Sequence, residues 1–172
     1  AGVMNPQIRY GEDLMSRVSY VMMHPEGAEL LTDTIREAIN GLFIELSEEA
    51  SSQIEDILEI ALVANPIMHH ILLGINPVNL GTAPFALTTS DAVDTRAAEI
   101  GLTAHPEARL YCLPCIAGHV GADAAGVILA EAPDRSEAMT LVVDVGTNAE
   151  IVLANHERIL VCSSPTGPAF EG

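Results

Sequence analysis

The residues with the clearest chemical potential lie in a polar turn between two apolar runs, within residues 141–153. The turn carries Asp144, Gly146, Thr147 and Asn148. A buried strand that ends in Asp144 places a carboxylate at its carboxyl end. Gly146 and Thr147 let backbone N–H groups and a hydroxyl face an oxyanion or a hydrated metal ion. These residues predict a phosphate-handling hairpin. Gly and Asn are also ordinary turn formers, so a plain β-hairpin is the alternative.

Cysteines and histidines are the other candidates for chemistry. Cys112 and Cys115 have the spacing of a redox or metal-binding pair, but they lie in an apolar run that has no second cysteine pair and no nearby pair of histidines at ligand spacing. We therefore interpret them as buried structural residues. His69 and His70 are neighbours on a predicted helix, where adjacent side chains point about 100° apart and cannot chelate one ion as a pair. Packing or loop contact is the preferred interpretation for them.

Composition excludes several classes of function. The chain has 172 residues, with 24 acidic residues against seven arginines, no lysine and a formal charge of −17. Binding to nucleic acid is disfavoured, because it depends on basic side chains that neutralise phosphates. The missing lysine removes a Walker-type phosphate loop and a Schiff-base mechanism within these residues. An acidic surface could attract a basic partner, although solubility is the simpler reason for it.

The same composition predicts a folded, cytoplasmic protein. Hydrophobic residues make up 49% of the chain, which is enough for one full core or two small lobes. No apolar run approaches the roughly 20 residues of a membrane-spanning helix, and no basic segment followed by an apolar one marks secretion. Three cysteines are too few for a disulfide framework and fit a reducing compartment.

The elements that must position the polar turn follow from hydrophobic periodicity, which predicts a mixed α/β fold. Helices are expected at 12–23, 25–45, 66–73, 92–100 and 124–130, and apolar strands at 57–63, 109–116, 141–145, 149–153 and 159–163. The strand at 57–63 is apolar almost throughout and is expected to be covered on both faces. Residues 75–90 read as a long ordered loop, and residues 132–138 form a proline-containing joint that is the candidate lobe boundary.

Two positions stand at the carboxyl ends of buried strands, where α/β folds bind ligands. Asn65 is expected to cap the helix after the strand at 57–63. Residues 117–123 form a turn of small residues, which indicates close backbone approach to a ligand or to a packed neighbour. Asp123, at its end, is expected to be a first-turn helix charge, with a ligand or metal role as the alternative.

The two ends of the chain share an unequal repeat. The carboxyl end has the order strand, strand, strand, polar loop. Residues 1–5 correspond to the third strand of such a unit, and residues 6–11 to the polar loop at 164–172. A first Asp-Gly-Thr hairpin is therefore expected before Ala1 and a ligand-completing lobe after Gly172, which would make the chain a middle section of a longer protein.

Five segments in order resemble the ATP-dependent reductive activators of corrinoid proteins, and together they span essentially the whole chain: residues 5–13, 68–74, 116–123, 144–150 and 167–172. The resemblance implies the ribonuclease H-like fold of actin, heat-shock protein 70 and the sugar kinases, called ASKHA. Residues 1–132 would form most of a first lobe without its phosphate hairpin, and residues 139–172 the beginning of a second lobe.

The resemblance also implies an activity. Such activators use ATP and Mg²⁺ to drive the reduction of a cobalt(II) corrinoid protein to cobalt(I) for methyl transfer. The electrons come from a 2Fe–2S domain, which would lie outside this chain. The expected partner is the corrinoid protein of a methyltransferase system, and a homodimer is one option for the assembly. This chain alone is expected to hydrolyse ATP poorly or not at all.

Residue roles carry over by position. Asp144 would lie near the nucleotide's metal ion, and Asp144 or Glu150 would position metal or water as the catalytic carboxylates. The resemblance implies a cofactor-binding set on the hairpin, on the loop after the third strand and on the first-lobe loop: Gly146, Thr147, Asn148, Ser164, Gly167, Asn5, Gln7 and Tyr10.

Some residues depart from the family pattern, and two other functions stay open. Ala149 stands where a glycine is usual, and its methyl group matters only if that residue has a positive φ. Pro114 and Cys115 stand where the family often has an asparagine. The cysteine set of a 2Fe–2S site is absent from the chain. The alternatives are a small-molecule kinase of the same superfamily and a non-catalytic acidic docking module.

Overall fold

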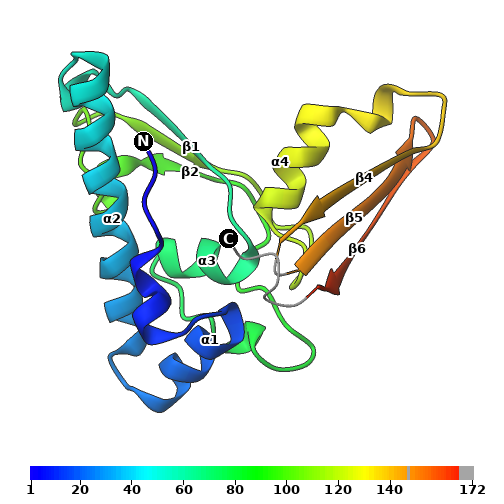
Figure 1. Ribbon diagram of the computed structural model, residues 1–172, viewed down its shortest axis with the longest axis horizontal. Coiled ribbons are helices and arrows are strands. Elements are labelled where there is room, and N and C mark those ends of the chain that lie inside the picture. Colours follow the sequence, from blue (N-terminus) through cyan, green and yellow to red (C-terminus); the bar gives the residue numbers. More distant parts are fainter. Residues whose placement is uncertain (147, 167–172) are drawn as a thin grey trace.

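The computed structural model describes residues 1–146 and 148–166, which form a mixed α/β structure with two groups of elements (Figure 1). The first group contains α1 (Leu14–Met23), α2 (Gly27–Ala50), α3 (Pro66–Leu72), β1 (Glu59–Leu62), β2 (Val93–Arg96) and β3 (Arg109–Cys112). The second group contains β4 (Thr140–Val145), β5 (Asn148–Asn155) and β6 (Arg158–Pro165), and α4 (Ala122–Glu131) lies between the groups. Short 3₁₀ turns complete the path: η1 (Pro6–Tyr10), η2 (Ile54–Asp56), η3 (Val78–Leu80), η4 (Ala97–Ile100) and η5 (Pro133–Arg135).

The first two helices follow the predicted apolar spacing. Asp13 begins α1, because its carboxylate accepts a hydrogen bond of 2.7 Å from the backbone N–H of Ser16. α2 continues past the predicted end at residue 45 to Ala50, where Ser51 closes it in the left-handed conformation with φ 53°. Both helices are confirmed, with shifted ends.

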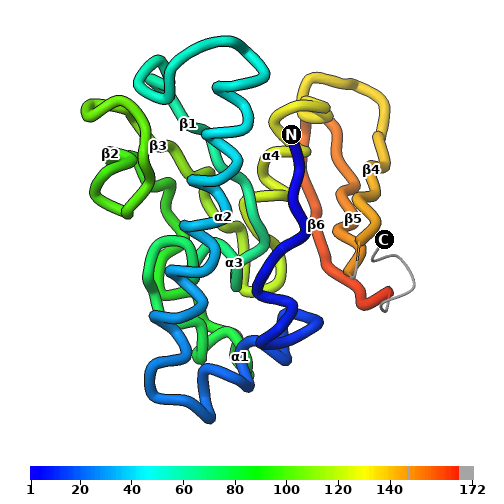
Figure 2. The backbone as a smooth tube through the Cα atoms, turned by 60° about the vertical axis from the view of Figure 1, so that its left-hand side comes forward, coloured from blue at the N-terminus to red at the C-terminus, as the bar shows by residue number. Residues whose placement is uncertain are grey.

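α2 contacts the carboxyl-terminal end of α3 and is bonded to it (Figure 2). The hydroxyl of Thr32 donates to the carbonyl of Ile71 at 2.8 Å, and the Nε of Arg36 donates to the carbonyl of Leu72 at 3.0 Å. Leu31 of α2 is fully buried in one hydrophobic cluster with residues of α1 and α3. Partly buried residues further along α2 pack on a second cluster beneath the first sheet: Ile35, Ile39 and Phe43.

The first sheet has the order β1-β3-β2, with β1 and β3 parallel and β2 antiparallel to β3. The expectation that the strand at 57–63 is covered on both faces was wrong. Ile60 is buried on the helix side, whereas Glu59 and Ala61 on the other face are exposed. This open face carries charged pairs, including one between Arg109 and Asp94.

The helix predicted at 92–100 was also wrong. Residues 93–96 form the strand β2, and only Ala97–Ile100 form a helical turn, which Gly101 ends with φ 73°. Val93 and Thr95 pair with Cys112 and Leu110 of β3. Hydrogen bonding to the edge of β3 therefore decides the structure of this segment, against its local helical periodicity.

The second sheet is an antiparallel meander in the order β4-β5-β6, which confirms the predicted hairpin and third strand. Along β5, Val152 and Ala154 are buried. The opposite face carries Leu141, Leu153 and Leu160, which lie opposite one another in register and are 62%, 38% and 52% exposed. Side chains alternate between the faces of a strand, so these three leucines share one face.

Residues 1–5 were predicted to correspond to a third strand, and this was wrong for the structure described. They form no strand and pair with no other described segment by a β-ladder. Their amino group lies 3.6 Å from the carboxylate of Glu49 in α2. None of the described helices has the length and apolar character that a membrane span requires.

Candidate functional site

A cleft of about 250 Å³ lies where the two groups of elements meet, and residues of the polar hairpin line it. Its lining combines residues of both groups: Glu12, Asp13, Leu14, Arg17, Asn65, Asp123, Asp144, Gly146, Asn148 and Glu150. Five of these side chains are carboxylates and one is a guanidinium. The cleft is therefore strongly acidic, with a single cation among the described lining residues.

The hairpin supplies the second-group wall. Asp144 of β4 lies directly opposite Glu150 of β5 in the ladder, and the N–H of Gly146 donates to the carbonyl of Asn148 at 2.8 Å across the turn. Directly opposed like charges destabilise a sheet, so this pair is not selected for stability. Glu150 accepts a hydrogen bond of 3.0 Å from the hydroxyl of Ser163 on β6.

Ala149, which departs from the family pattern, is compatible with the hairpin. It lies in β5 and pairs with Val145 of β4. It is not among the described non-glycine residues that have positive φ. Its methyl group is buried, with 6% of the residue exposed. A glycine is therefore not required at this position by backbone conformation.

Asp123 is brought to the cleft by the first turn of α4. Its carboxylate accepts a hydrogen bond of 2.8 Å from the N–H of Ala124, and its own N–H donates to the carbonyl of Ala64 at the end of β1. A side chain on Gly121 would lie 2.7 Å from that same carbonyl. The small-residue turn is thus explained by a packed neighbour, and the structure also places Asp123 where the alternative ligand role requires it.

Two carboxylates of the cleft, Asp123 and Glu150, have raised pKa values. Burial raises the pKa of Asp123, and the charge of Asp144 adds to that rise. Burial likewise raises the pKa of Glu150, with further contributions from Asp123 and Asp144. Groups whose ionised forms are destabilised in this way are suited to binding a cation or to holding a proton.

Asn65 and Arg17 line the first-group wall. The side chain of Asn65 caps α3 by accepting from the N–H of Met68 at 2.9 Å, as the sequence predicted. Arg17 was missed. It is 8% exposed, and its Nε donates to the carbonyl of Gly11 at 3.1 Å. The available signal was its helical phase, because Arg17 interrupts the apolar stripe of α1 and a charge on such a stripe is rarely buried without a reason.

Other predicted binding residues are not among those that line the cleft. The side chain of Asn5 caps η1, and Gln7 is fully buried and donates to the carbonyl of Leu31 at 2.7 Å. Tyr10 packs on the ring of Tyr20 at 5.1 Å between centroids. Ser164 is exposed on β6. These contacts are structural, and a cofactor-binding role for the residues stays a prediction.

Thr147 and Gly167 lie outside the described residues, so their predicted roles are untested. The neighbouring Thr166 donates a hydrogen bond from its hydroxyl to the carbonyl of Gly146. The residue that follows β6 is therefore bonded to the turn of the hairpin.

The structure also places the histidines and cysteines. Nδ1 of His70 lies 2.8 Å from the carbonyl of Pro66, and its Nε2 accepts from the N–H of Thr88 at 3.1 Å, as expected for a loop contact. Cys112 and Cys115 are buried, and burial raises the pKa of the Cys112 thiol to about 11. Burial raises the pKa of the Cys115 thiol as well, so both thiols stay protonated at neutral pH, in agreement with a structural interpretation.

The donor set suits a hard cation that keeps part of its water shell. Among the described residues, no cluster of three or more histidine, cysteine or acidic side chains could hold a metal ion by itself. Mg²⁺ is commonly bound through one or two carboxylates together with phosphate oxygens and water. Asp144, with Glu150 opposite, fits that incomplete set, so the site is compatible with a metal ion that arrives with a nucleotide.

Comparisons with known proteins cover both groups of elements. A family model described as the RACo middle region matches residues 1–136, and one described as the C-terminal domain of RACo, the ASKHA domain, matches residues 138–172. The chain is 33% identical over 170 residues to the corrinoid activation enzyme RamQ of Eubacterium limosum, and the match covers 99% of this chain and 28% of RamQ.

A solved structure of a reductive activator for corrinoid,iron-sulfur protein superposes with a TM-score of 0.95 at 32% identity. The match covers 100% of this chain and 27% of that chain. The chain thus spans little more than a quarter of the length of these relatives.

Proposed function

The chain belongs to the RACo family, and on that premise we propose that it forms part of the nucleotide cleft of an ATP-dependent activator. In this proposal the intact activator reduces the cobalt(II) corrinoid of a protein partner to cobalt(I), in the service of methyl transfer. The similar proteins are named as a corrinoid activation enzyme and a reductive activator, which supports the general role.

The observation that carries the proposal is the meeting, in one cleft, of carboxylates from α4 and from the hairpin of the second group. Asp123 comes from the first turn of α4, and Asp144 and Glu150 come from the hairpin. We assign residues 1–132 to a first lobe and residues 139–172 to the start of a second, so that the cleft lies between lobes. A cleft between lobes is a usual place for a nucleotide.

The residues support phosphate positioning with water as the nucleophile. Asp144 would hold Mg²⁺, which would neutralise the charge of the phosphates and of the transition state. Asp123 and Glu150, whose pKa values are raised, would orient the attacking water. The turn of the hairpin, with Gly146 and Asn148, would lie along the phosphate chain.

The iron–sulfur group does not fit this chain. Four cysteine thiolates hold a 2Fe–2S cluster, whereas this chain has three cysteines, of which Cys112 and Cys115 are buried and Cys162 is exposed. We place the cluster of the proposal outside these residues and assign it no step here. Free cysteines agree with the reducing, cytoplasmic location that the proposal includes. A homodimer stays an open part of the proposal.

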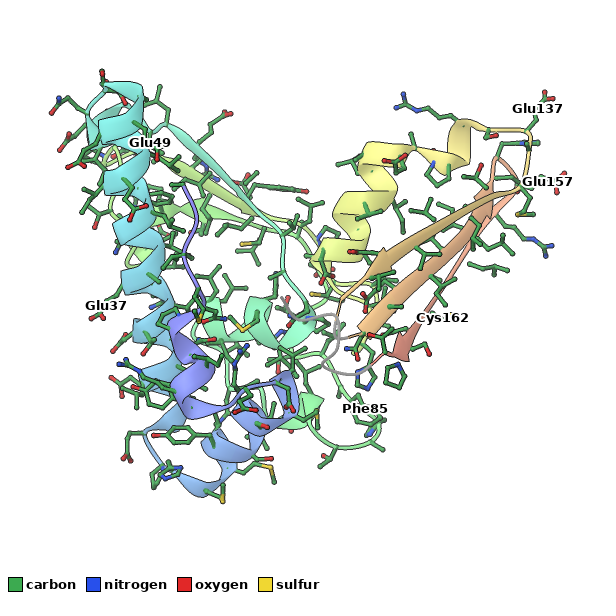
Figure 3. All side chains as sticks on the ribbon, viewed as in Figure 1. Glu37, Glu49, Phe85, Glu137, Glu157 and Cys162 are labelled. Carbon is green, nitrogen blue, oxygen red and sulfur yellow. The ribbon has the colours of Figure 1, made fainter. Side chains whose placement is uncertain are left out.

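The experiment that tests the proposal compares Asp144→Asn with Glu157→Gln in the intact activator. Glu157 lies at the far end of the second sheet, away from the cleft (Figure 3), and serves as the matched control. We expect Asp144→Asn to lower ATP turnover at least about hundredfold, as loss of a group that stabilises transition-state charge does, and Glu157→Gln to leave it unchanged.

Three outcomes would contradict the proposal. If calorimetry detects no Mg-ATP binding, a docking module explains the chain better. Phosphate transfer to a sugar or a carboxylate would favour a small-molecule kinase. Turnover by the 172-residue chain alone at the rate of the intact activator would refute the two-lobe arrangement.

A further inference from the structure

We propose that Arg17 is a nucleotide-contacting residue whose guanidinium binds the terminal phosphate of ATP. The inference rests on the proposed function and deepens it, because it assigns the discrimination between nucleoside triphosphate and diphosphate to one side chain. The sequence motifs that carry the family resemblance do not extend to this residue, since the first of them ends at residue 13.

The position of Arg17 is set by three separate elements. Its Nε donates to the carbonyl of Gly11, which follows η1, and its Nη1 donates to the sulfur of Met68 on α3 at 3.4 Å. Its backbone N–H donates to the carbonyl of Asp13, the residue that caps α1. A guanidinium bonded both to the loop after η1 and to α3 has already lost much of its rotamer freedom, so little further entropy is lost when it binds an anion.

Gly11 allows this arrangement through close approach. A side chain on Gly11 would lie 2.6 Å from the backbone nitrogen of Arg17 and 2.7 Å from the carbonyl carbon of Ser16. Gly11 has φ 167°, an extended conformation that any residue adopts, so the glycine is needed for space and not for its backbone angle. The loop therefore closes on the base of α1 and aims the Arg17 side chain at the cleft.

The charge balance of the cleft gives Arg17 its role. Among the described residues that line the cleft, Arg17 is the one cation beside five carboxylates. A nucleotide phosphate entering there meets repulsion from every other charged side chain of the wall. A buried guanidinium forms charge-assisted, often bidentate hydrogen bonds with phosphate oxygens, which are about twice as strong as neutral ones.

The wall on which Arg17 lies indicates which phosphate it binds. Arg17 and Asp123, which is proposed to orient the attacking water, both line the cleft from elements of residues 1–132, whereas the hairpin turn lines it from the second sheet. Water attacks the terminal phosphate, so the group next to Asp123 is that phosphate. Arg17 is therefore expected to contact a group that ATP has and ADP lacks.

The test measures the affinities of the intact activator for Mg-ATP and Mg-ADP in the variants Arg17→Ala and Arg17→Lys. We expect Arg17→Ala to weaken ATP binding about tenfold to hundredfold, the usual loss for a hydrogen bond to a charged group, and ADP binding less than about threefold. Arg17→Lys keeps the charge without the planar fork, so an intermediate loss is expected. Millimolar guanidinium ion should restore part of the ATP affinity of Arg17→Ala.

Arg158→Gln is the matched control, because Arg158 is an exposed arginine at the start of β6, outside the cleft. Equal losses of ATP and ADP affinity, without rescue by guanidinium, would make Arg17 a structural residue and overturn the inference. If Arg17→Ala does not fold, the ATP-to-ADP ratio of Arg17→Lys decides in the same way. Failure of the unaltered protein to bind any nucleotide would refute the proposed function itself.

Discussion

At the scale of single residues, the cleft contains carboxylates whose charges do not stabilise the fold. Asp144 and Glu150 oppose each other across the hairpin, and Asp123 adds a third carboxylate whose pKa is raised by burial. A raised carboxyl pKa means that the ionised group destabilises the folded state. This cost is fully present above the folded-state pKa and vanishes below the unfolded-state value of about 3.9.

Asp123→Asn should therefore raise the melting temperature of the protein at pH 7, measured without metal by differential scanning calorimetry. The gain should shrink as the pH falls toward 4, because Asp123 itself then becomes neutral. In the same variant ATP turnover should fall about a hundredfold or more, the contribution expected of a group that acts on the reacting water. Asp134→Asn, which alters an acidic residue outside the cleft, is the control. An unchanged melting temperature together with normal turnover would contradict both roles of Asp123.

His69 gives a prediction about pH. It is 2% exposed, neither ring nitrogen has a hydrogen-bond partner among the described residues, and burial lowers its pKa. Burial also lowers the pKa of His70, which accepts from Thr88 and would lose that bond on protonation. A histidine with a lowered pKa contributes stability above the unfolded-state value of about 6.5, and this contribution is lost as the pH falls toward the folded-state pKa.

Urea unfolding should therefore show a decrease in the free energy of unfolding between pH 7.5 and pH 5. His69→Leu should flatten that decrease and should add about 1 kcal/mol at pH 7.5, because it removes a buried polar group that lacks partners among the described residues. His156→Gln, at an exposed position, should follow the unaltered protein. A steeper acid loss in His69→Leu than in the unaltered protein would show that the neutral imidazole is not the origin of the effect.

Residue types and spacing were enough to predict Asp144 as a cleft residue, because an acidic residue at the end of an apolar strand, beside a glycine turn, is typical of a phosphate-binding hairpin. Glu150 was added by the family resemblance. Residue types and spacing were not enough to place Arg17 in the cleft or to show that Gln7 lies outside its lining. Both side chains are buried in this fold, and their partners are backbone carbonyls at Gly11 and Leu31 that only the folded chain brings near. Such contacts have no signature in spacing along the sequence.

At the scale of elements, turns made of glycine allow the segments around the cleft to approach one another. A side chain on Gly118 would lie 2.0 Å from the carbonyl of Phe85, whose ring packs on His119 at 4.3 Å between centroids. Phe85 is part of the long loop predicted at 75–90, which Figure 3 shows extending below the second sheet. The loop is thus ordered by its contact with the turn before α4.

Gly11→Ala is expected to destabilise the protein by about 1–3 kcal/mol, the usual cost of overpacking, because the added methyl group would overlap the backbone of α1. The change should also displace Arg17 and weaken ATP binding more than ADP binding. Chemical denaturation and calorimetry on the same preparation would measure the two effects.

Gly41→Ala is the matched control for that change. Gly41 lies inside α2, and a side chain there would meet nothing within 4 Å. Alanine in a helix interior is favoured over glycine, so this variant should gain about 0.5–1 kcal/mol. If Gly11→Ala were as stable as Gly41→Ala, the close approach at Gly11 would not constrain α1.

Most elements could be predicted from periodicity and caps, and the failures have one cause. The helix expected at 92–100 became β2, and residues 1–5 formed no strand, because ladder pairing depends on which strand edge is available in three dimensions. The exposed face of β1 could not be predicted for the same reason, because it depends on which elements pack together in three dimensions. Glu59 is solvated on a face that no described element covers.

At the scale of the whole molecule, the proposed nucleotide site is surrounded by negative charge. The formal charge of −17 and the acidic lining of the cleft both repel free ATP, which is itself a polyanion. Arg17 alone offsets part of this repulsion among the described lining residues. Binding should therefore require that a divalent cation reaches the carboxylates together with the phosphates.

Chelation of Mg²⁺ should lower the ATP affinity of the intact activator at least about hundredfold, since phosphate and carboxylate charges then face each other without a cation. Added monovalent salt should speed the association of Mg-ATP, because salt screens repulsion between like charges over a Debye length of about 10 Å at 0.1 M. Most anion-binding proteins show the opposite trend, since their sites attract the ligand. Stopped-flow measurements between about 0.02 M and 0.3 M KCl would show the direction, and association that slows with salt would mean that an attractive surface, and not this acidic cleft, receives the nucleotide.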